Sequence, residues 1–152
     1  MTADTIHFVR CWVDGGVLGR NPSPRGVYWS VRIENFRNGD RPIMIRKRTR
    51  AYRTNNEAEY LALREVLLWL NEKEVRMPVV IYSDSKLIVN QFNDRFATNV
   101  PALVQLRDEC RALAERLKHR VILTLAGMRL DSQGRLRRVE KPRATMVRKL
   151  GH

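Results

Sequence analysis

Residues 54–72, TNNEAEYLALREVLLWLNE, decide the fold because their apolar residues recur at helical spacing. The positions that carry this period are Ala58, Leu61, Ala62, Leu67, Leu68 and Leu70. Thr54 or Asn55 supplies the polar side chain that caps the start of a helix. The stretch therefore predicts one long helix over 55–72, and the segments on either side of it have a different composition.

Three strand-like segments precede this helix. Residues 6–13 (IHFVRCWV) are rich in β-branched and aromatic residues, and Asp14-Gly15-Gly16 is predicted to break that strand. After a loop rich in Gly, Asn and Pro, residues 27–33 (VYWSVRI) resume a strand, which we expect to pair antiparallel with the first. Asn38-Gly39-Asp40 is a hairpin-turn signal that leads into a third strand over 42–50.

Strands and helices alternate after the long helix. Residues 78–82 (PVVIY) are nearly all apolar, which is typical of a parallel strand covered on both faces. Ser83-Asp84-Ser85 is expected to cap a second helix that ends near Phe92. A third helix follows Pro101, and residues 121–126 form a last strand of the sheet.

The C-terminal part has a weaker pattern. A turn at 131–134 (DSQG) joins two strand-like pieces, and 142–150 is predicted as a short basic helix. The whole order predicts an α/β fold with a mixed five-stranded sheet and helices on both faces. A single domain is expected over 1–152, with its core at about 6–126 and a hairpin and short helix at 127–152.

The charge of the chain indicates a polyanionic partner. The 29 Lys and Arg against 16 Asp and Glu give a formal net charge of +13 and a pI near 10.8. This excess favours nucleic acid, although charge alone does not select among polyanions. Cys11 and Cys110 lack the spacing of a zinc site and are interpreted as buried thiols in a reducing compartment. We expect a cytoplasmic monomer without a membrane span or a disulfide-linked partner.

Three acidic residues lie where the predicted elements would bring them together. Asp14 follows the first strand, Asp84 follows the apolar strand, and Glu59 lies in the first turns of the helix between them. Singly, each has an ordinary interpretation as a turn residue, a helix cap or a solvated helix position. If the two strands are neighbours, the three acids converge, and clustered carboxylates in so basic a chain indicate a hard divalent cation among them.

The sequence around these acids resembles the type 1 ribonuclease H family in three motifs. Residues 13–26 (VDGGVLGRNPSPRG) resemble its opening Asp-Gly motif and the Gly- and Asn-Pro-containing loop that follows. Residues 54–63 (TNNEAEYLAL) are similar to its Thr-Asn-Asn-x-x-Glu helix start, and 81–91 (IYSDSKLIVNQ) to its third motif. The resemblance covers roughly 8–126 and implies a ribonuclease H-like fold.

The resemblance also implies an activity and a cofactor. It implies a metal-dependent endonuclease that cleaves the RNA strand of RNA/DNA hybrids and leaves a 3′-hydroxyl and a 5′-phosphate. Asp14, Glu59 and Asp84 would be the catalytic residues and would bind two Mg²⁺ or Mn²⁺ ions, with Asp14 shared between them. Glu57 is expected to face solvent.

Residues that would contact the hybrid follow from the same resemblance. The set is Gly15, Asn21, Thr54, Asn55, Asn56 and Lys86. The loop 19–26 and Glu59 are expected to meet RNA 2′-hydroxyls, and Thr54 a DNA phosphate. Plain helix capping is the alternative for Asn55, and an ordinary surface lysine is the alternative for Lys86.

Two features depart from the family. Residues 92–100 (FNDRFATNV) are short and not basic, so the tryptophan-containing basic handle is missing. In 141–145 (KPRAT), Thr145 stands where the family has a fourth metal-binding Asp, and a Thr hydroxyl is a poor ligand for Mg²⁺. Three explanations stay open: Asp131 or Glu140 reaches the site, three carboxylates suffice, or activity is impaired.

Two other functions remain as alternatives. A catalytically weak or inactive module would bind hybrid or structured RNA through the same surface. A nuclease that acts on DNA is the other, and the run from Thr54 to Asn56 argues against it.

Overall fold

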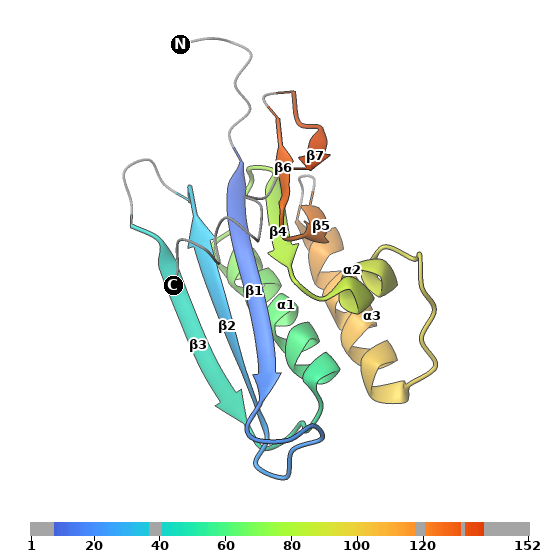
Figure 1. Cartoon of the computed structure of the whole chain (residues 1–152). Coiled ribbons are helices and arrows are strands. Elements are labelled where there is room, and N and C mark those ends of the chain that lie inside the picture. The colour runs from blue at the N-terminus through green and yellow to red at the C-terminus, as the bar shows by residue number, and fades with distance from the viewer. Residues whose placement is uncertain (1–7, 37–40, 118–120, 132, 139–152) are drawn as a thin grey trace, which may run out of the picture.

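The computed structural model describes residues 8–36, 41–117, 121–131 and 133–138, and Figure 1 shows the arrangement of its elements. Five strands form one sheet in the order β3-β2-β1-β4-β5. They are β1 (Val9–Val17), β2 (Val27–Glu34), β3 (Ile43–Thr49), β4 (Val79–Ser83) and β5 (Val121–Leu125). Because β1 pairs antiparallel with β2 and parallel with β4, the sheet is mixed, as the sequence predicts.

Within the described residues, three helices accompany the sheet: α1 (Asn55–Glu72), α2 (Lys86–Phe92) and α3 (Pro101–Arg116). α1 packs across β1 and β2, and α3 packs on α1, so both lie on the same side of the sheet (Figure 1). α2 lies against β4 and β5. The helix predicted at 142–150 lies outside the described residues.

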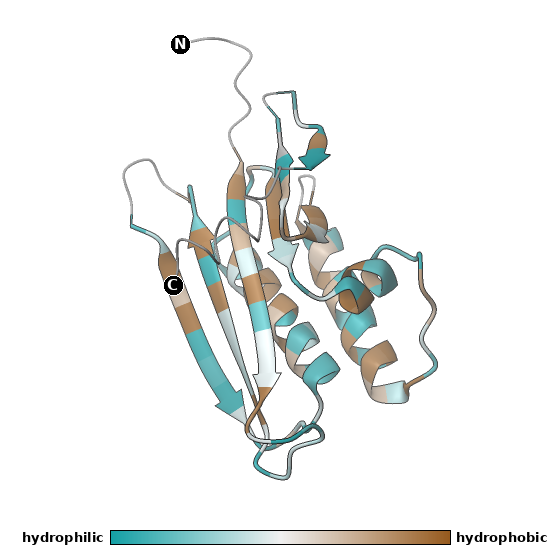
Figure 2. Cartoon of the chain, in the orientation of Figure 1, coloured by the Kyte–Doolittle hydropathy of each residue, from teal (hydrophilic) through white to brown (hydrophobic). Residues whose placement is uncertain are grey.

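The core lies between α1 and the face of the sheet that α1 covers, which we call the inner face. Alternate residues of β1 and β2 point to this face and are buried, whereas the residues between them point to the opposite, outer face. β4 is buried along its whole length, in agreement with its apolar composition. Figure 2 shows hydrophobic residues spread over the sheet and helices, while the C-terminal half of β3 is hydrophilic.

The first strand extends past its predicted break. Every residue from Asp14 to Val17 has a partner in β2, so the expectation that Asp14 ends the strand is wrong on the antiparallel side. On the parallel side, pairing with β4 ends where Val13 lies opposite Ser83. Asp14 and Asp84 each come directly after this last pair. The two acids are therefore neighbours at one end of the parallel ladder because their strands are adjacent, as predicted, although β1 itself continues past Asp14.

The remaining boundaries agree closely with the sequence. α1 begins after the N-cap Thr54, and α2 begins after the N-cap Ser85. β6 (Met128–Leu130) and β7 (Leu136–Arg138) form the hairpin expected around the turn at 131–134. The turn predicted at 38–40 lies outside the described residues. Within the described part of the chain, no helix has both the length and the apolar character needed to cross a membrane.

Candidate active site

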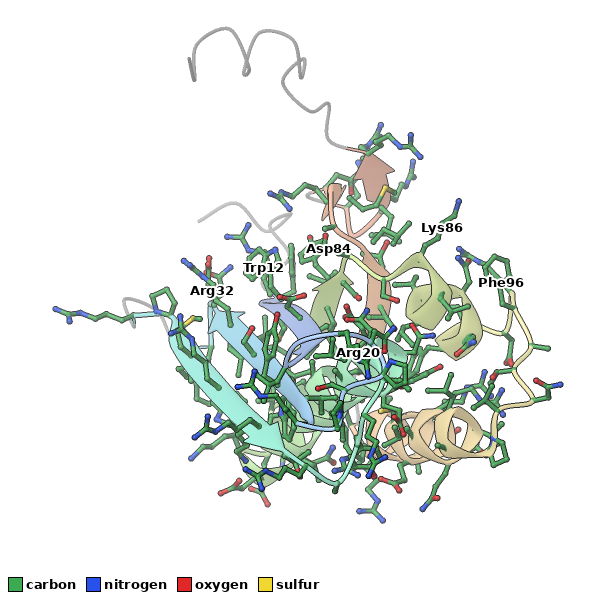
Figure 3. The ribbon with its side chains drawn as sticks, turned by 60° about the horizontal axis from the view of Figure 1, so that its bottom comes forward. Trp12, Arg20, Arg32, Asp84, Lys86 and Phe96 are labelled. Carbon is green, nitrogen blue, oxygen red and sulfur yellow. The ribbon has the colours of Figure 1, made fainter. Side chains whose placement is uncertain are left out.

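Asp14 and Asp84 line one cleft on the outer face of the sheet. The cleft has a volume of about 190 Å³ and is lined by Trp12, Val13, Asp14, Ser30, Arg32, Met44, Tyr82, Asp84 and Ala126. Figure 3 shows Trp12 and Asp84 next to one another, with Arg32 on the neighbouring strand. Both aspartates are exposed. The structure thus brings together two of the three acids that the sequence singles out.

Glu59 approaches from α1 because Gly15 leaves room for the first turn of that helix. Gly15 points to the inner face, and a Cβ at this position would lie 2.3 Å from the carbonyl carbon and oxygen of Ala58. No side chain fits in so close a contact with backbone atoms. Glu59, which follows Ala58, is therefore held against β1.

The Glu59 carboxylate is buried in an unfavourable electrostatic environment. The residue is 7% exposed, and among the described residues its Oε2 atom has no hydrogen-bond partner. Burial raises the pKa of Glu59 from its ordinary 4.5 to about 7, and the negative charges of Asp14 and Asp84 act in the same direction. A backbone hydrogen bond from Gly15 lowers this pKa in part. The three acids are therefore close enough to interact electrostatically.

The donor set suits a hard divalent cation. Such ions prefer carboxylate oxygens, and a cation at this place would satisfy the unpartnered Oε2 of Glu59 and offset the repulsion among the three charges. Among the described residues, no group of three or more His, Cys, Asp or Glu side chains has the arrangement of a single-ion site. A divalent cation therefore fits this place by the chemistry and charge of its donors, of which Asp14 and Asp84 come from the sheet and Glu59 from α1.

The start of α1 and the β1–β2 loop form the neighbouring part of the site. Thr54 and Glu57 make a capping box: the Thr54 hydroxyl accepts from the Glu57 N–H at 3.2 Å, and the Glu57 carboxylate accepts from the Thr54 N–H at 2.9 Å. Glu57 is thus engaged in the cap and does not simply face solvent as expected. Asn21 accepts a hydrogen bond from the Asn55 N–H at 3.1 Å, which ties the loop to the helix start.

The other predicted hybrid contacts are more dispersed. Asn56 is half-buried next to Asn55 in the first turn of α1. Lys86 is exposed at the first position of α2 and points away from the cleft (Figure 3). Gly15 is buried under α1, so its side of the strand serves packing.

Of the three residues considered for a fourth ligand, the structure describes only Asp131. Its carboxylate accepts hydrogen bonds from the Gln133 and Arg135 backbone and from Arg137 Nε at 2.7 Å. The hydrogen bond from Arg137 is the main reason that the pKa of Asp131 is lowered to about 2. Asp131 therefore braces the β6–β7 turn. Glu140 and Thr145 lie outside the described residues.

An aromatic stack beside the acids is the main feature that the sequence interpretation missed. Trp12 and Tyr82 stack with ring centroids 5.4 Å apart. The Arg10 guanidinium lies 5.9 Å from the Trp12 ring centroid, and that of Arg129 lies 5.5 Å from the Tyr82 centroid. Each ring is two residues before an aspartate, and this period of two would have placed them on the same face as Asp14.

The comparisons with known proteins agree with this fold. The reverse transcriptase-like family model matches residues 15–124. Ribonuclease H1 from the halophilic archaeon Halobacterium salinarum is 22% identical with a TM-score of 0.66, over 78% of this chain and 85% of that one. The N-terminal ribonuclease H domain of a Mycobacterium tuberculosis protein, solved as a fusion with maltose binding protein, is 24% identical with a TM-score of 0.68, over 78% and 81%.

A third structure contains a nucleic acid. This ribonuclease H1, isolated from compost by a metagenomic approach and solved with an RNA/DNA hybrid, is 23% identical with a TM-score of 0.65, over 77% of this chain and 83% of that one. No curated protein matches the chain. The structural likenesses show that the mixed five-stranded sheet is that of the ribonuclease H fold.

Proposed function

Since the chain belongs to the reverse transcriptase-like family, we propose that it is a metal-dependent endonuclease that hydrolyses the RNA strand of RNA/DNA hybrids. The observation that carries this proposal is the buried Glu59 carboxylate, whose Oε2 has no hydrogen-bond partner in the part of the chain that the structure describes and whose pKa is raised beside Asp14 and Asp84. Carboxylates that lie this close together, one of them buried, destabilise the fold unless bound cations offset their repulsion and the cost of burial.

Asp14, Glu59 and Asp84 would hold two Mg²⁺ or Mn²⁺ ions. When bound, such ions activate water for in-line attack on a phosphodiester and stabilise the leaving 3′ oxygen. The protein fixes the positions of the three carboxylates. Gly15 allows α1 to approach β1 closely, and the end of the β1–β4 ladder places the two aspartates side by side. Rigid placement of the carboxylates keeps the scissile phosphate oriented.

Substrate choice is assigned to the loop and helix start next to the acids. Asn21 and Asn55 are held together by a hydrogen bond, and Thr54 and Asn56 flank them. We assign these residues, with the Gly15 backbone and Lys86, to the hybrid, because RNA is distinguished from DNA through its 2′-hydroxyls in a shallow minor groove. The buried free cysteines, Cys11 and Cys110, fit a reducing compartment, and we place the enzyme in the cytoplasm as a monomer.

A catalytically weak hybrid-binding module is the second candidate. It is favoured by Thr145, which stands where the resemblance predicts an acidic ligand. Loss of one charged oxygen would weaken metal binding while the basic surface kept its affinity for nucleic acid.

A cleavage assay separates these candidates. Labelled RNA/DNA hybrid, double-stranded RNA and double-stranded DNA are incubated with the protein in Mg²⁺ or Mn²⁺. The proposal expects cleavage of the hybrid alone, with 5′-phosphate products. Tight binding of hybrid without cleavage in either metal would support the second candidate, and cleavage of the DNA duplex would contradict both.

A further inference from the structure

Beyond the acids, the outer face of β2 and β3 carries a cluster of arginines. Arg46 and Arg48 lie on β3, Arg50 follows it, and Arg25 lies in the loop before β2. All four are exposed. We call these four residues, together with Tyr28 on β2, the arginine face.

The charge of this cluster is not neutralised by acidic side chains in the described part of the chain. None of the four arginines forms an ion pair with a carboxylate in the described residues, whereas Lys47, between two of them, pairs with Glu65 at 3.0 Å. Side-by-side cations repel one another, which costs stability unless an anion is bound. The arrangement indicates an external polyanion.

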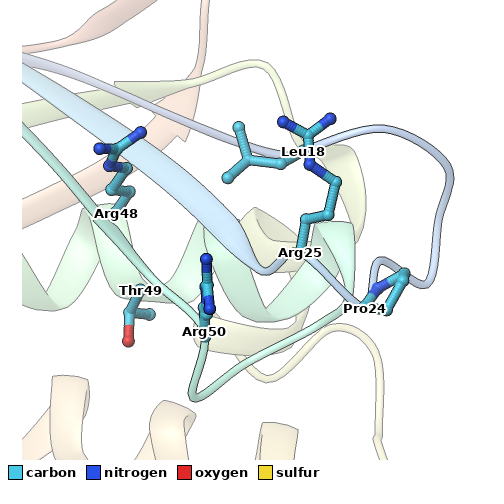
Figure 4. Close-up of a pocket in the computed structure, with 6 residues that line it drawn as sticks. All are labelled: Leu18, Pro24, Arg25, Arg48, Thr49 and Arg50. Carbon is cyan, nitrogen blue, oxygen red and sulfur yellow. The ribbon is translucent and has the colours of Figure 1, made fainter.

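The cluster is also hollowed. A groove of about 610 Å³ is lined by Arg25, Arg48 and Arg50 together with Leu18, Pro24 and Thr49, as Figure 4 shows. A second groove of about 400 Å³ is lined by Tyr28, Trp29, Ser30, Arg46, Lys47 and Arg48. Arg48 lines both grooves, so the two grooves adjoin at this residue, and we call them together the track.

Tyr28 adds an aromatic surface to this track. It is 42% exposed, and its ring lies over Gly16, where a Cβ would come within 2.5 Å of the Tyr28 hydroxyl. Gly16 and Asp14 point to the same face of β1. An exposed ring among cations is the combination that binds unpaired bases and their backbone, because every base can stack on it.

The track connects with the acids along the sheet. Asp14 pairs with Ser30, and Ser30 pairs with Arg46, so these three side chains form one row on the outer face. Two inter-strand steps separate Asp14 from Arg46, or about 10 Å. A nucleic-acid strand at Asp14 can therefore continue directly onto the arginine face.

We propose that the arginine face binds a single-stranded extension of the nucleic acid that occupies the acidic site. This inference rests on the proposed function for the identity of the substrate.

The test measures binding without cleavage. Fluorescence anisotropy in EDTA gives the Kd for a labelled oligothymidylate of about twelve nucleotides, for a blunt hybrid, and for the same hybrid with such an extension. In the wild-type protein the extended hybrid should have a lower Kd than the blunt hybrid, and we call this difference the extension advantage. The doubly substituted Arg46→Gln/Arg48→Gln protein should bind the oligothymidylate at least about fivefold more weakly and should lose the extension advantage. Its affinity for the blunt hybrid should change less than about twofold.

Matched variants distinguish position from charge. Arg76→Gln/Arg116→Gln removes two exposed arginines next to the C-terminal end of α1 and should leave the extension advantage unchanged.

The Tyr28 variants test the aromatic ring. Tyr28→Phe should keep oligothymidylate binding, whereas Tyr28→Ala should weaken it. Thermal unfolding checks that all variants fold.

Two results would overturn the inference: an extension advantage that survives in Arg46→Gln/Arg48→Gln, or an equal loss in the Arg76→Gln/Arg116→Gln control. Failure of the proposed function is a separate result. If the wild-type protein cleaves no hybrid but binds oligothymidylate through Arg46 and Arg48, the inference about the arginine face stands and the proposed nuclease function is contradicted.

Discussion

Asp14 presents its carboxylate on the outer face of β1 and is exposed, so its substitution removes a charge without disturbing the core. Asp14→Asn should lower hybrid cleavage to below about one hundredth of the wild-type rate, because the amide is neutral and a poor ligand for Mg²⁺. Hybrid affinity in EDTA should stay within about threefold. Single-turnover cleavage and anisotropy give the two values, and a fully active variant would contradict the assignment of Asp14 to the metal.

The buried Glu59 carboxylate makes the free energy of unfolding depend on pH. Its pKa is about 7 in the folded protein against 4.5 ordinarily, so the fold disfavours its charged form. The resulting destabilisation is absent below pH 4.5, grows as pH rises towards 7, and is complete above it. In EDTA at pH 8, Glu59→Gln should raise the free energy of unfolding by about 1–3 kcal/mol while abolishing cleavage. At pH 4 urea unfolding should show little difference, and destabilisation at pH 8 would contradict the prediction.

Thr145 carries the test of the fourth ligand. If it occupies the position of the family's Asp, wild-type cleavage should be low in Mg²⁺ and relatively better in Mn²⁺, which tolerates imperfect geometry. Thr145→Asp should then raise the rate in Mg²⁺ about tenfold, measured on labelled hybrid.

The control for this prediction is Asp131, whose carboxylate is already satisfied by the turn and by Arg137. Asp131→Asn should leave the rate unchanged. An unchanged rate in Thr145→Asp, together with loss of activity in Asp131→Asn or Glu140→Gln, would place the fourth ligand in the C-terminal hairpin region instead.

At the scale of elements, Gly15 and Gly16 offer a direct comparison, since the same methyl group meets different neighbours. At Gly15 it would meet the Ala58 backbone at 2.3 Å, and at Gly16 the end of the Tyr28 side chain at 2.5 Å. Gly15→Ala should destabilise the fold by about 3 kcal/mol and displace α1, whereas Gly16→Ala should cost less than about 1 kcal/mol. Urea unfolding of both variants tests this, and equal losses would contradict the role of Gly15.

The elements show what sequence can and cannot predict. The bounds of α1 follow from its period and its cap, because both signals are local. The end of β1 was predicted wrongly because two glycines indicate a turn, while pairing with β2 depends on residues further along the chain. The motifs locate Asp14, Glu59 and Asp84 because each motif is a local stretch of sequence. The Trp12–Tyr82 stack joins two strands that are far apart in the chain, and neither this stack nor the capping role of Glu57 was expected from the motifs.

For the whole molecule, the net charge of +13 predicts how binding responds to salt. Hybrid affinity should fall steeply, with a slope of log K against log salt on the order of −5 if about six phosphates are contacted. Titration from low to moderate KCl with fluorescent hybrid measures the slope. A flat titration would show that the basic surface is not the binding surface.

The position of β3 at the edge of the sheet has one more consequence. An edge strand exposes unpaired backbone groups that can add to the edge of another molecule and begin aggregation. In two copies of this chain, Arg46 and Arg48 would meet their equivalents, and their mutual repulsion keeps the edges apart. Neutralising this strand, by substitution or by a bound polyanion, removes the barrier to self-association, so the residues that recruit nucleic acid also keep the protein from polymerising.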